Sequence, residues 1–319
     1  MDRALIIGSA GQDGRLLSDR LEHDGCAVVG VERNRVNCSG VAVSGAPVDI
    51  LDPIAVGDLI NSFSPEAIFY LAAYHHSAED KPPPDDLELY VRSHEVHVLG
   101  LIHVLEAVHK HAPRSRLFYA ASSHCFGEPP IAVQDESTPL RPHCVYGITK
   151  TAGVELCRMY RADRRVRASA GFLYNHESAL RPRKFLSTKI VSAAAEISLG
   201  RRDKLVLGDL SAHVDWGFAP DYVDAMIRIV RLETADDFII ATGQSHSVEE
   251  FVAAAFSRVG LDWRQHVEVE PAIIGKPRSA FVGDSTKLRT ATGWSPSVTF
   301  QQMVELLVDA KVQRLSAAC

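Results

Sequence analysis

The N-terminal segment has the pattern of a strand, a glycine-rich turn and a helix. The apolar run RALIIG (3–8) is followed by GSAGQDG, in which Gly8, Gly11 and Gly14 recur at every third position, and then by RLLSDRLEHDG. Gly8 permits a tight turn, Gly11 lets the backbone approach a pyrophosphate, and Gly14 lets the helix pack closely on the strand. The helix N-terminus then faces the phosphates. This order predicts a Rossmann-type, doubly wound parallel sheet that binds NAD or NADP, rather than a simple strand–helix turn.

The end of the second predicted strand, CAVVGVER, bears on the choice of cofactor. Glu32 stands eighteen residues after Gly14, close to the spacing of the acid that binds a ribose 2′-hydroxyl. Its neighbour Arg33 could instead take a 2′-phosphate or lie in a solvated loop. A carboxylate repels a phosphate, so NAD is slightly favoured over NADP. Further predicted cofactor contacts lie in the glycine turn, at the end of a third strand, and in the small residues that end a fourth: Gln12, Asp13, Asp49, Ile50, Leu71, Ala72 and Ala73.

Three residues further along the chain could carry chemistry. A fifth predicted strand, SRLFYAASS, contains Ser122 at its end, and Tyr146-x-x-x-Lys150 opens a helix. This spacing puts Tyr146 and Lys150 on one helix face, where an ammonium would lower the pKa of the phenol. A tyrosinate could then remove a hydroxyl proton while hydride leaves carbon for a nicotinamide, and Ser122 could hydrogen-bond the same oxygen. Together with the glycine turn, this set strongly indicates hydride-transfer chemistry.

The chain resembles extended short-chain dehydrogenases/reductases and, within them, GDP-mannose 4,6-dehydratases and their relatives, over nearly its whole length. The strings that carry the resemblance are GSAGQDG, FLYNHES (172–178), DWGFAPDYVDAM (215–226), FIIATGQSHSVEEFV (238–252) and GDSTKLRTATGW (283–294). The resemblance implies an α/β fold with a smaller C-terminal α/β substrate-binding domain for a nucleoside diphosphate sugar. It also implies transient oxidation at the sugar C4, with Ser122, Tyr146 and Lys150 as catalytic residues. Asn175 matches an asparagine near the substrate pyrophosphate.

The resemblance is broken at the strand end that carries Ser122. Where the family reads Thr-x-Glu, this chain reads Ser122-Ser123-His124, so the glutamate that takes the C5 proton during water elimination is missing. His124 could replace that base, because an ordinary imidazole titrates near neutrality. Val214 stands close to where the family has an arginine before DWG, and GKPRSAF (275–281) replaces a stretch with arginine and glutamate. The predicted substrate contacts are His76, Ser123, Asn175, Lys189 and Arg278.

The second half of the chain has a looser pattern, which predicts a second domain. We expect residues 1–171 plus roughly 215–260 to form the NAD(P)-binding domain, and 172–214 plus roughly 261–319 to form the nucleotide-sugar-binding domain. Basic side chains gather between residues 181 and 202 of an otherwise acidic chain. They could bind a diphosphate or form an ordinary solvated helix surface.

Three functions fit these residues. A nucleotide-sugar 4,6-dehydratase that uses His124 is favoured. An epimerase or a 4-keto-sugar reductase is the alternative, because either needs only the serine, tyrosine and lysine. A cofactor-bound scaffold without chemistry is disfavoured by the intact Tyr146 and Lys150. By resemblance we expect a homodimer or homotetramer.

Composition limits the partners and the compartment. A net charge of −6 does not favour binding to nucleic acid or to an anionic membrane. No apolar run approaches the roughly 20 residues of a membrane span. Six scattered cysteines predict reduced thiols in the cytoplasm rather than disulfides or a metal site. We interpret four histidines of the helix predicted over 96–111 as structural or exposed rather than as metal ligands: His97, His103, His109 and His111.

Overall fold

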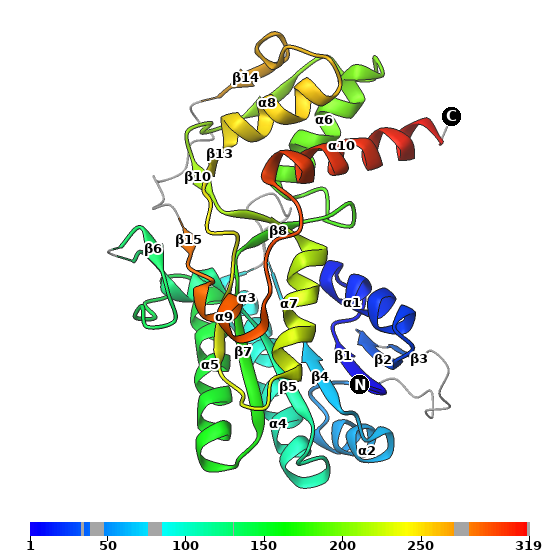
Figure 1. Cartoon of the computed structure of the whole chain (residues 1–319), viewed down its shortest axis with the longest axis vertical. Coiled ribbons are helices and arrows are strands. Elements are labelled where there is room, and N and C mark those ends of the chain that lie inside the picture. Colours follow the sequence, from blue (N-terminus) through cyan, green and yellow to red (C-terminus); the bar gives the residue numbers. More distant parts are fainter. Residues whose placement is uncertain (33–34, 39–47, 76–84, 130, 271–280, 318–319) are drawn as a thin grey trace.

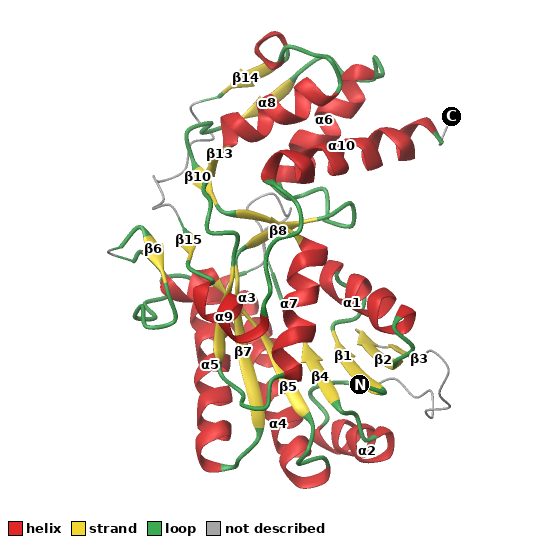
Figure 2. Cartoon of the chain, in the orientation of Figure 1, coloured by secondary structure: helices red, strands yellow, loops and turns green. Residues whose placement is uncertain are grey.

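A single central sheet organises the larger part of the molecule. The computed structural model describes residues 1–32, 35–38, 48–75, 85–129, 131–270 and 281–317, drawn by element in Figures 1 and 2. The sheet strands are β1 Arg3–Ile7, β2 Ala27–Glu32, β3 Arg35–Cys38, β4 Ala67–Tyr70, β5 Arg116–Ser122, β7 Arg167–Leu173 and β12 Asp237–Ile240. Their spatial order is β12-β7-β5-β4-β1-β2-β3. All run parallel except β3, which pairs antiparallel with β2 at the edge.

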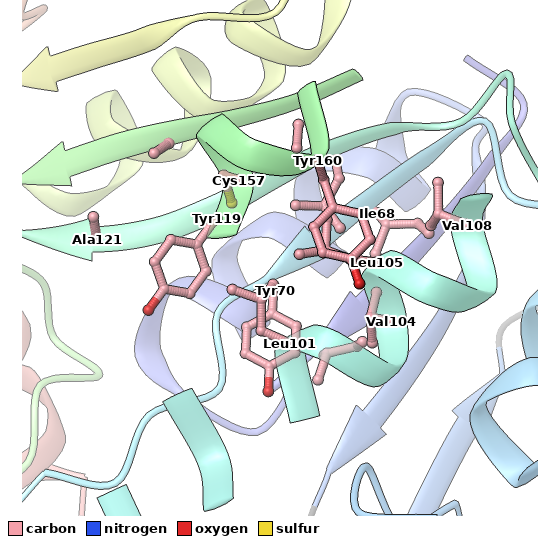
Figure 3. Packing of buried hydrophobic residues seen from close by; sticks show 14 of the residues in the cluster. Ile68, Tyr70, Leu101, Val104, Leu105, Val108, Tyr119, Ala121, Cys157 and Tyr160 are labelled. Atoms are coloured by element: carbon pink, nitrogen blue, oxygen red, sulfur yellow. The ribbon is translucent and has the colours of Figure 1, made fainter. Parts of the chain in front are cut away.

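Helices cover both faces of this sheet, because its parallel strands are apolar on both sides. One face is covered by α2 Pro53–Phe63, α4 Gly100–His111 and α5 Val145–Asp163, and the other by α1 Gln12–His23, α7 Ala219–Arg231 and α9 Thr286–Thr292. Figure 3 shows the first of these layers, where Tyr70 and Tyr119 of the sheet meet Leu101 of α4 and Cys157 of α5. This is the doubly wound α/β sheet predicted from the glycine turn.

A second, smaller hydrophobic core lies above the sheet in Figure 1. It is built by α6 Leu186–Ser198, α8 Val248–Arg258 and α10 Phe300–Ser316, with the strand pair β9 Leu205–Leu207 and β14 Val267–Val269. Short strand pairs connect the two parts: β8 Asn175–Glu177 with β11 Trp216–Phe218, and β10 His213–Val214 with β13 His246–Ser247. The remaining elements are α3 Asp86–His94, a π-helical turn Glu95–Leu99, 3-10 turns Ser123–Phe126 and Trp263–Gln265, and strands β6 Val133–Gln134 and β15 Val282–Gly283.

The packing bears on the predicted division into domains. Helix α7 and strand β12 join the sheet, as expected for part of 215–260. Helix α8 instead packs with α6 and α10, where Phe251 is fully buried. Leu288 of α9 and Trp294 pack with α7 in the larger core. The domain boundaries stay a prediction, and this packing favours assigning α8 to the smaller part and α9 to the larger.

The predicted third strand ending at Asp49 is wrong in its described part. Residues 48–50 are not in a strand, and the third strand is β3, earlier in the chain. The Asp49 carboxylate accepts a hydrogen bond from Leu51 N at 2.9 Å, which closes a turn. Asp52 then caps α2 by accepting from Ile54 N at 2.9 Å, with proline next to it at the first helical position. The polar side chains of DILDP therefore favour a turn and a helix start over a strand.

The described part of the chain contains no helix that is both long and apolar enough to cross a membrane.

Candidate active site

The glycine turn between β1 and α1 is shaped by two of its three glycines. Gly8 has a φ of +97°, and a Cβ there would lie 2.6 Å from Ala72 N. A Cβ on Gly14 would lie 2.6 Å from Ser9 Cα. A Cβ on Gly11 would meet only a backbone oxygen at 3.4 Å, which is ordinary contact. The packing of the chain therefore requires Gly8 and Gly14 but not Gly11, as expected if Gly11 leaves room for a ligand.

Two polar features of the turn suit an anionic cofactor group. Helix α1 starts after Gly11, and within the described residues no side chain caps its first N–H groups. The buried hydroxyl of Ser9 also has no hydrogen-bond partner in that part of the chain. Buried donors usually find an acceptor, and a pyrophosphate at a helix N-terminus provides one. The residues present therefore fit the phosphates of a dinucleotide.

The segment after β4 borders this turn as predicted. Leu71 N donates to Ile7 O at 2.8 Å, and Ala72 lies against Gly8. Ala73 follows and is exposed. His103 donates through Nδ1 to the Ile50 carbonyl at 2.8 Å, and Ile50 stays a predicted cofactor contact.

Glu32 is the last residue of β2 and is half-buried, whereas Arg33 lies outside the described residues.

Ser122, Tyr146 and Lys150 gather at the carboxyl end of β5. The Ser122 hydroxyl accepts from His124 N at 3.2 Å, which starts the 3-10 turn. Lys150 is buried, and its ammonium donates to Ala120 O at 2.8 Å and lies 5.7 Å from the centre of the Tyr146 ring. These contacts bring together the residues that the sequence predicted to be catalytic.

The predicted lowering of the tyrosine pKa is not found in the unliganded chain. Burial raises the pKa of Tyr146 above its ordinary value of 10, and burial lowers the pKa of Lys150 to about 8. Desolvation disfavours the charged form of both groups and is the largest cause of both shifts. The buried surroundings of Tyr146 therefore favour the neutral phenol over the tyrosinate.

Within the described residues, three imidazoles approach the Tyr146 ring edge-on. The ring centres of His75, His97 and His124 lie 5.3, 5.3 and 6.0 Å from that of Tyr146. The sequence singled out only His124 for this place. The other two approach Tyr146 from the segment after β4 and from the π-helical turn, so their presence depended on the packing of distant segments.

His97 is structural, as interpreted from the sequence, but it lies against the site. Its Nε2 accepts from Tyr74 N at 2.9 Å, so the proton is on Nδ1, which donates to Thr149 Oγ1 at 2.7 Å. Burial lowers the pKa of His97 to about 2, which keeps this ring neutral. His97 therefore joins the segment after β4 to the first turns of α5, where Tyr146 stands.

Hydrogen bonds join the glycine turn directly to the segment that contains β8. Gln12 Nε2 donates to His176 O at 3.2 Å, and Ser178 Oγ donates to Gln12 Oε1 at 2.9 Å. Asp13 pairs with His176 Nε2 at 3.0 Å. The side chains of Gln12 and Asp13, predicted as cofactor contacts, are thus engaged within the chain. The sequence missed His176, although the NHES string held it.

The predicted substrate residues are only partly placed. Asn175 is exposed at the start of β8, Ser123 is buried beside Ser122, and Lys189 is half-buried in α6. His76 and Arg278 lie outside the described residues. Near Asn175, the buried Glu177 carboxylate accepts from Ser187 Oγ at 2.6 Å and pairs with Arg181 Nε at 3.4 Å, an ion pair that the sequence did not reveal.

The fold and the site define a class. A parallel Rossmann sheet with a glycine turn after β1, a serine at the end of β5 and a Tyr/Lys pair on α5 is typical of short-chain dehydrogenases/reductases.

The comparisons identify the family within that class. The family described as GDP-mannose 4,6 dehydratase matches residues 5–307. GDP-mannose 4,6 dehydratase 1 of Arabidopsis thaliana is 34% identical over 97% of this chain and 90% of its own length. The chain belongs to the GDP-mannose 4,6-dehydratase family, which confirms the resemblance drawn from its sequence motifs.

Solved structures agree with the fold. RMD from Pseudomonas aeruginosa, complexed with NADPH, superposes with a TM-score of 0.84 at 19% identity, covering 98% of this chain and 100% of the other. The dTDP-glucose 4,6-dehydratase of Bacillus anthracis, in complex with NAD, gives a TM-score of 0.81 at 17% identity, covering 99% and 98%.

Proposed function

We propose that this chain is an NAD(P)-dependent nucleotide-sugar 4,6-dehydratase that works through a 4-keto intermediate. The observation that carries the proposal is the gathering of Ser122, Tyr146 and Lys150 at the carboxyl end of β5 in a member of this family. The family name indicates GDP-mannose as the first substrate to test. NAD remains slightly favoured over NADP because of Glu32.

Each side chain at the site has its own role in the proposed reaction. The bound dinucleotide would accept the C4 hydride and later return it to C6. Tyr146 takes the 4-hydroxyl proton, and Ser122 holds the same oxygen by a hydrogen bond. Lys150 stands close enough to stabilise the tyrosinate that forms. The ketone acidifies the C5 proton, which His124 would remove and pass to the C6 hydroxyl, so that this hydroxyl leaves as water. When the hydride returns to C6, the proton that Tyr146 took would return to the sugar at C5.

The raised pKa of Tyr146 sets a condition on the first step. The phenol has to be ionised before it can take the 4-hydroxyl proton, and nearby positive charge favours that ionisation. Lys150 supplies one such charge, and an oxidised nicotinamide ring would bring a second. We therefore expect Tyr146 to become reactive only when the cofactor is bound.

An epimerase or 4-keto-sugar reductase is the second candidate. The observation that favours it is the histidine at position 124, where the resemblance implies a glutamate base. Both reactions use Ser122, Tyr146 and Lys150 and need no residue for water elimination.

A panel of nucleoside diphosphate sugars, followed by mass spectrometry, tests these proposals. Loss of one water from the sugar supports the dehydratase. A new isomer of unchanged mass supports the epimerase, and stoichiometric consumption of NADH with a 4-keto sugar supports the reductase. No turnover of any sugar in the panel would count against an enzymatic function.

We also propose that the chain forms a homodimer through α3 and α5, as family resemblance suggests. Leu87, Tyr90 and Val91 share one face of α3 and are 68, 46 and 47% exposed. Ile148 and Met159 of the adjoining α5 are 41 and 46% exposed. Large exposed apolar side chains on two adjoining helices are typical of a protein interface. A homotetramer would need a second contact surface.

A cytoplasmic location stays a prediction. Four cysteines of the described residues are free: Cys26, Cys125, Cys144 and Cys157. Free thiols are compatible with a reducing compartment. Fractionation of cells that produce the protein would test it.

A further inference from the structure

The protonation state of His176 follows from its hydrogen bonds. Nδ1 lies 2.6 Å from Tyr174 O, and a carbonyl oxygen only accepts, so Nδ1 carries a proton. Nε2 lies 3.1 and 3.0 Å from the two carboxylate oxygens of Asp13. An ionised carboxylate also only accepts, so Nε2 carries a proton too. His176 is therefore an imidazolium paired with the Asp13 carboxylate.

The charged groups around this pair balance each other. Arg181 acts on both members of the pair, and the Glu177 carboxylate lies 3.4 Å from its guanidinium. Tyr222 of α7 stacks on the imidazole with ring centres 4.5 Å apart, and burial holds that phenol neutral by raising its pKa. His176 is thus the charged group that directly contacts Asp13, and Gln12 Nε2 also donates to Asp13 Oδ1 at 3.2 Å.

The pKa directions agree with an ion pair. Burial alone would raise the pKa of Asp13 and lower that of His176, but their attraction and hydrogen bond reverse both shifts. The pKa of Asp13 is lowered from 3.8, and that of His176 is raised from 6.5.

The position of Asp13 makes its charge relevant to cofactor binding. It is the second residue of α1, next to the uncapped N-terminus that suits a pyrophosphate. An unpaired carboxylate there would repel the phosphates across a poorly solvated gap. The negative charge of Asp13 also contributes to the raised pKa of Tyr146, so losing its partner would disturb the catalytic tyrosine as well.

We propose that His176 is a positioning residue that, as an imidazolium, neutralises Asp13 behind the glycine turn and ties that turn to β8, so that a dinucleotide binds tightly only while the pair is intact. The inference rests on the cofactor binding of the proposed function. It goes further, because it makes His176, a residue of β8, necessary for binding a pyrophosphate at the glycine turn. Asn175, the neighbour of His176, is itself a predicted substrate contact, so the two ligand sites share one short segment.

The pH dependence of dinucleotide affinity tests the role of the charge. Calorimetric titration of the full chain with NAD⁺ and with NADPH, from about pH 6 to pH 9.5, should show binding that weakens on the order of tenfold as His176 loses its proton. His176→Gln should bind weakly at every pH. The matched control His213→Gln changes an exposed histidine of β10 and should follow the wild-type profile.

The double variant separates lost charge from lost shape. Asp13→Asn should bind with little dependence on pH, and Asp13→Asn/His176→Gln should recover most of the affinity that His176→Gln loses. A purely structural role for His176 predicts the opposite, because the second substitution would then add to the damage. Should His176→Gln not fold, Asp13→Asn alone still tests whether the pH profile flattens.

Nitrogen NMR of histidine-labelled protein gives a readout without cofactor. Both ring nitrogens of His176 should be protonated at neutral pH in the wild type, and one in Asp13→Asn. A singly protonated His176, or a His176→Gln variant with wild-type affinity and pH profile, overturns the inference. A wild-type chain that binds neither dinucleotide at any pH would instead sink the proposed function together with this role of His176.

Discussion

The side chains around Tyr146 determine which proton transfers the site can perform. The two hydrogen bonds of His97 fix its ring as a neutral imidazole, which borders Tyr146 without exchanging protons. Lys150 is fully buried, so its charge is strongly felt but also costly. His124 is half-buried at the end of β5, where a reacting sugar could reach it. His124 is our candidate for the base, because it also stands where the resemblance implies the glutamate of the family.

The substitution His124→Ala should separate the two halves of the reaction. Loss of a general base costs about 10²–10⁴-fold, so water elimination should fall by that factor. Oxidation at C4 should persist and be visible as transient reduction of the bound dinucleotide by absorbance. The control His23→Ala changes an exposed histidine at the end of α1. Full dehydration by His124→Ala would refute the replacement-base idea.

The Asp13–His176 pair should also make stability depend on pH. The lowered pKa of Asp13 means that its contribution is present above its unfolded value of 3.8 and is lost as pH falls through the folded pKa. The raised pKa of His176 means that its contribution is present below 6.5 and is lost as pH rises through the folded pKa. Asp13→Asn should therefore destabilise by about 1–3 kcal/mol near pH 5.5 and by less near pH 9.

Urea unfolding at the two pH values measures this difference. Asp19→Asn is the matched control, because Asp19 is an exposed carboxylate on the same helix. An equal loss of stability at both pH values would show that Asp13 acts through its shape and not through its charge.

Among the elements, the glycine turn contains one glycine that the fold requires and another that we expect only cofactor binding to require. Gly14→Ala places a Cβ against the backbone of Ser9 and should cost about 1–3 kcal/mol or more. Gly11→Ala meets no such obstacle and has a φ of −68°, so stability should change by less than about 1 kcal/mol. Dinucleotide affinity should nevertheless fall in Gly11→Ala, because the methyl group would occupy the space left for the phosphates.

Thermal unfolding and calorimetric titration of both variants check this pair of expectations. Gly25→Ala serves as a control for changing a glycine elsewhere at the end of α1, although its φ of +81° gives it a cost of its own. Unchanged dinucleotide binding in Gly11→Ala would contradict the placement of the phosphates.

The sequence predicted most elements and failed where local chemistry was ambiguous. The strands β1, β4 and β5 and the helices α1 and α5 were recognisable from apolar runs and periodicity, whereas the helix expected over 96–111 is a π-helical turn and α4, and α3 before it was missed. The segment DILDP was taken for a strand end, although its aspartates and proline form a turn and a helix cap. An Asx turn and a cap satisfy the same backbone groups that a strand would pair, and the apolar Ile50 concealed the difference.

For the whole molecule, the exposed apolar face of α3 and α5 predicts association of two copies. Val91→Glu/Ile148→Glu should yield a monomer of 34.9 kDa by sedimentation, while the wild type sediments as a dimer. Because Tyr146 opens α5, the separated chain should also lose activity. Ile54→Glu, at a 74% exposed position on α2, is the control. A wild-type monomer at micromolar concentration would refute the interface.

The sequence was sufficient for the Rossmann sheet, the cofactor turn, the Ser–Tyr–Lys set and the family, because each depends on neighbouring residues or on a fixed spacing along one helix. It did not indicate that His75 and His97 border Tyr146, that Lys150 fails to lower the pKa of the phenol, or that Asp13 pairs with His176. Asp13 and His176 are 163 residues apart. Contacts of that kind, and the desolvation that shifts the pKa values, arise only when segments far apart in the sequence pack together at the carboxyl edge of the sheet.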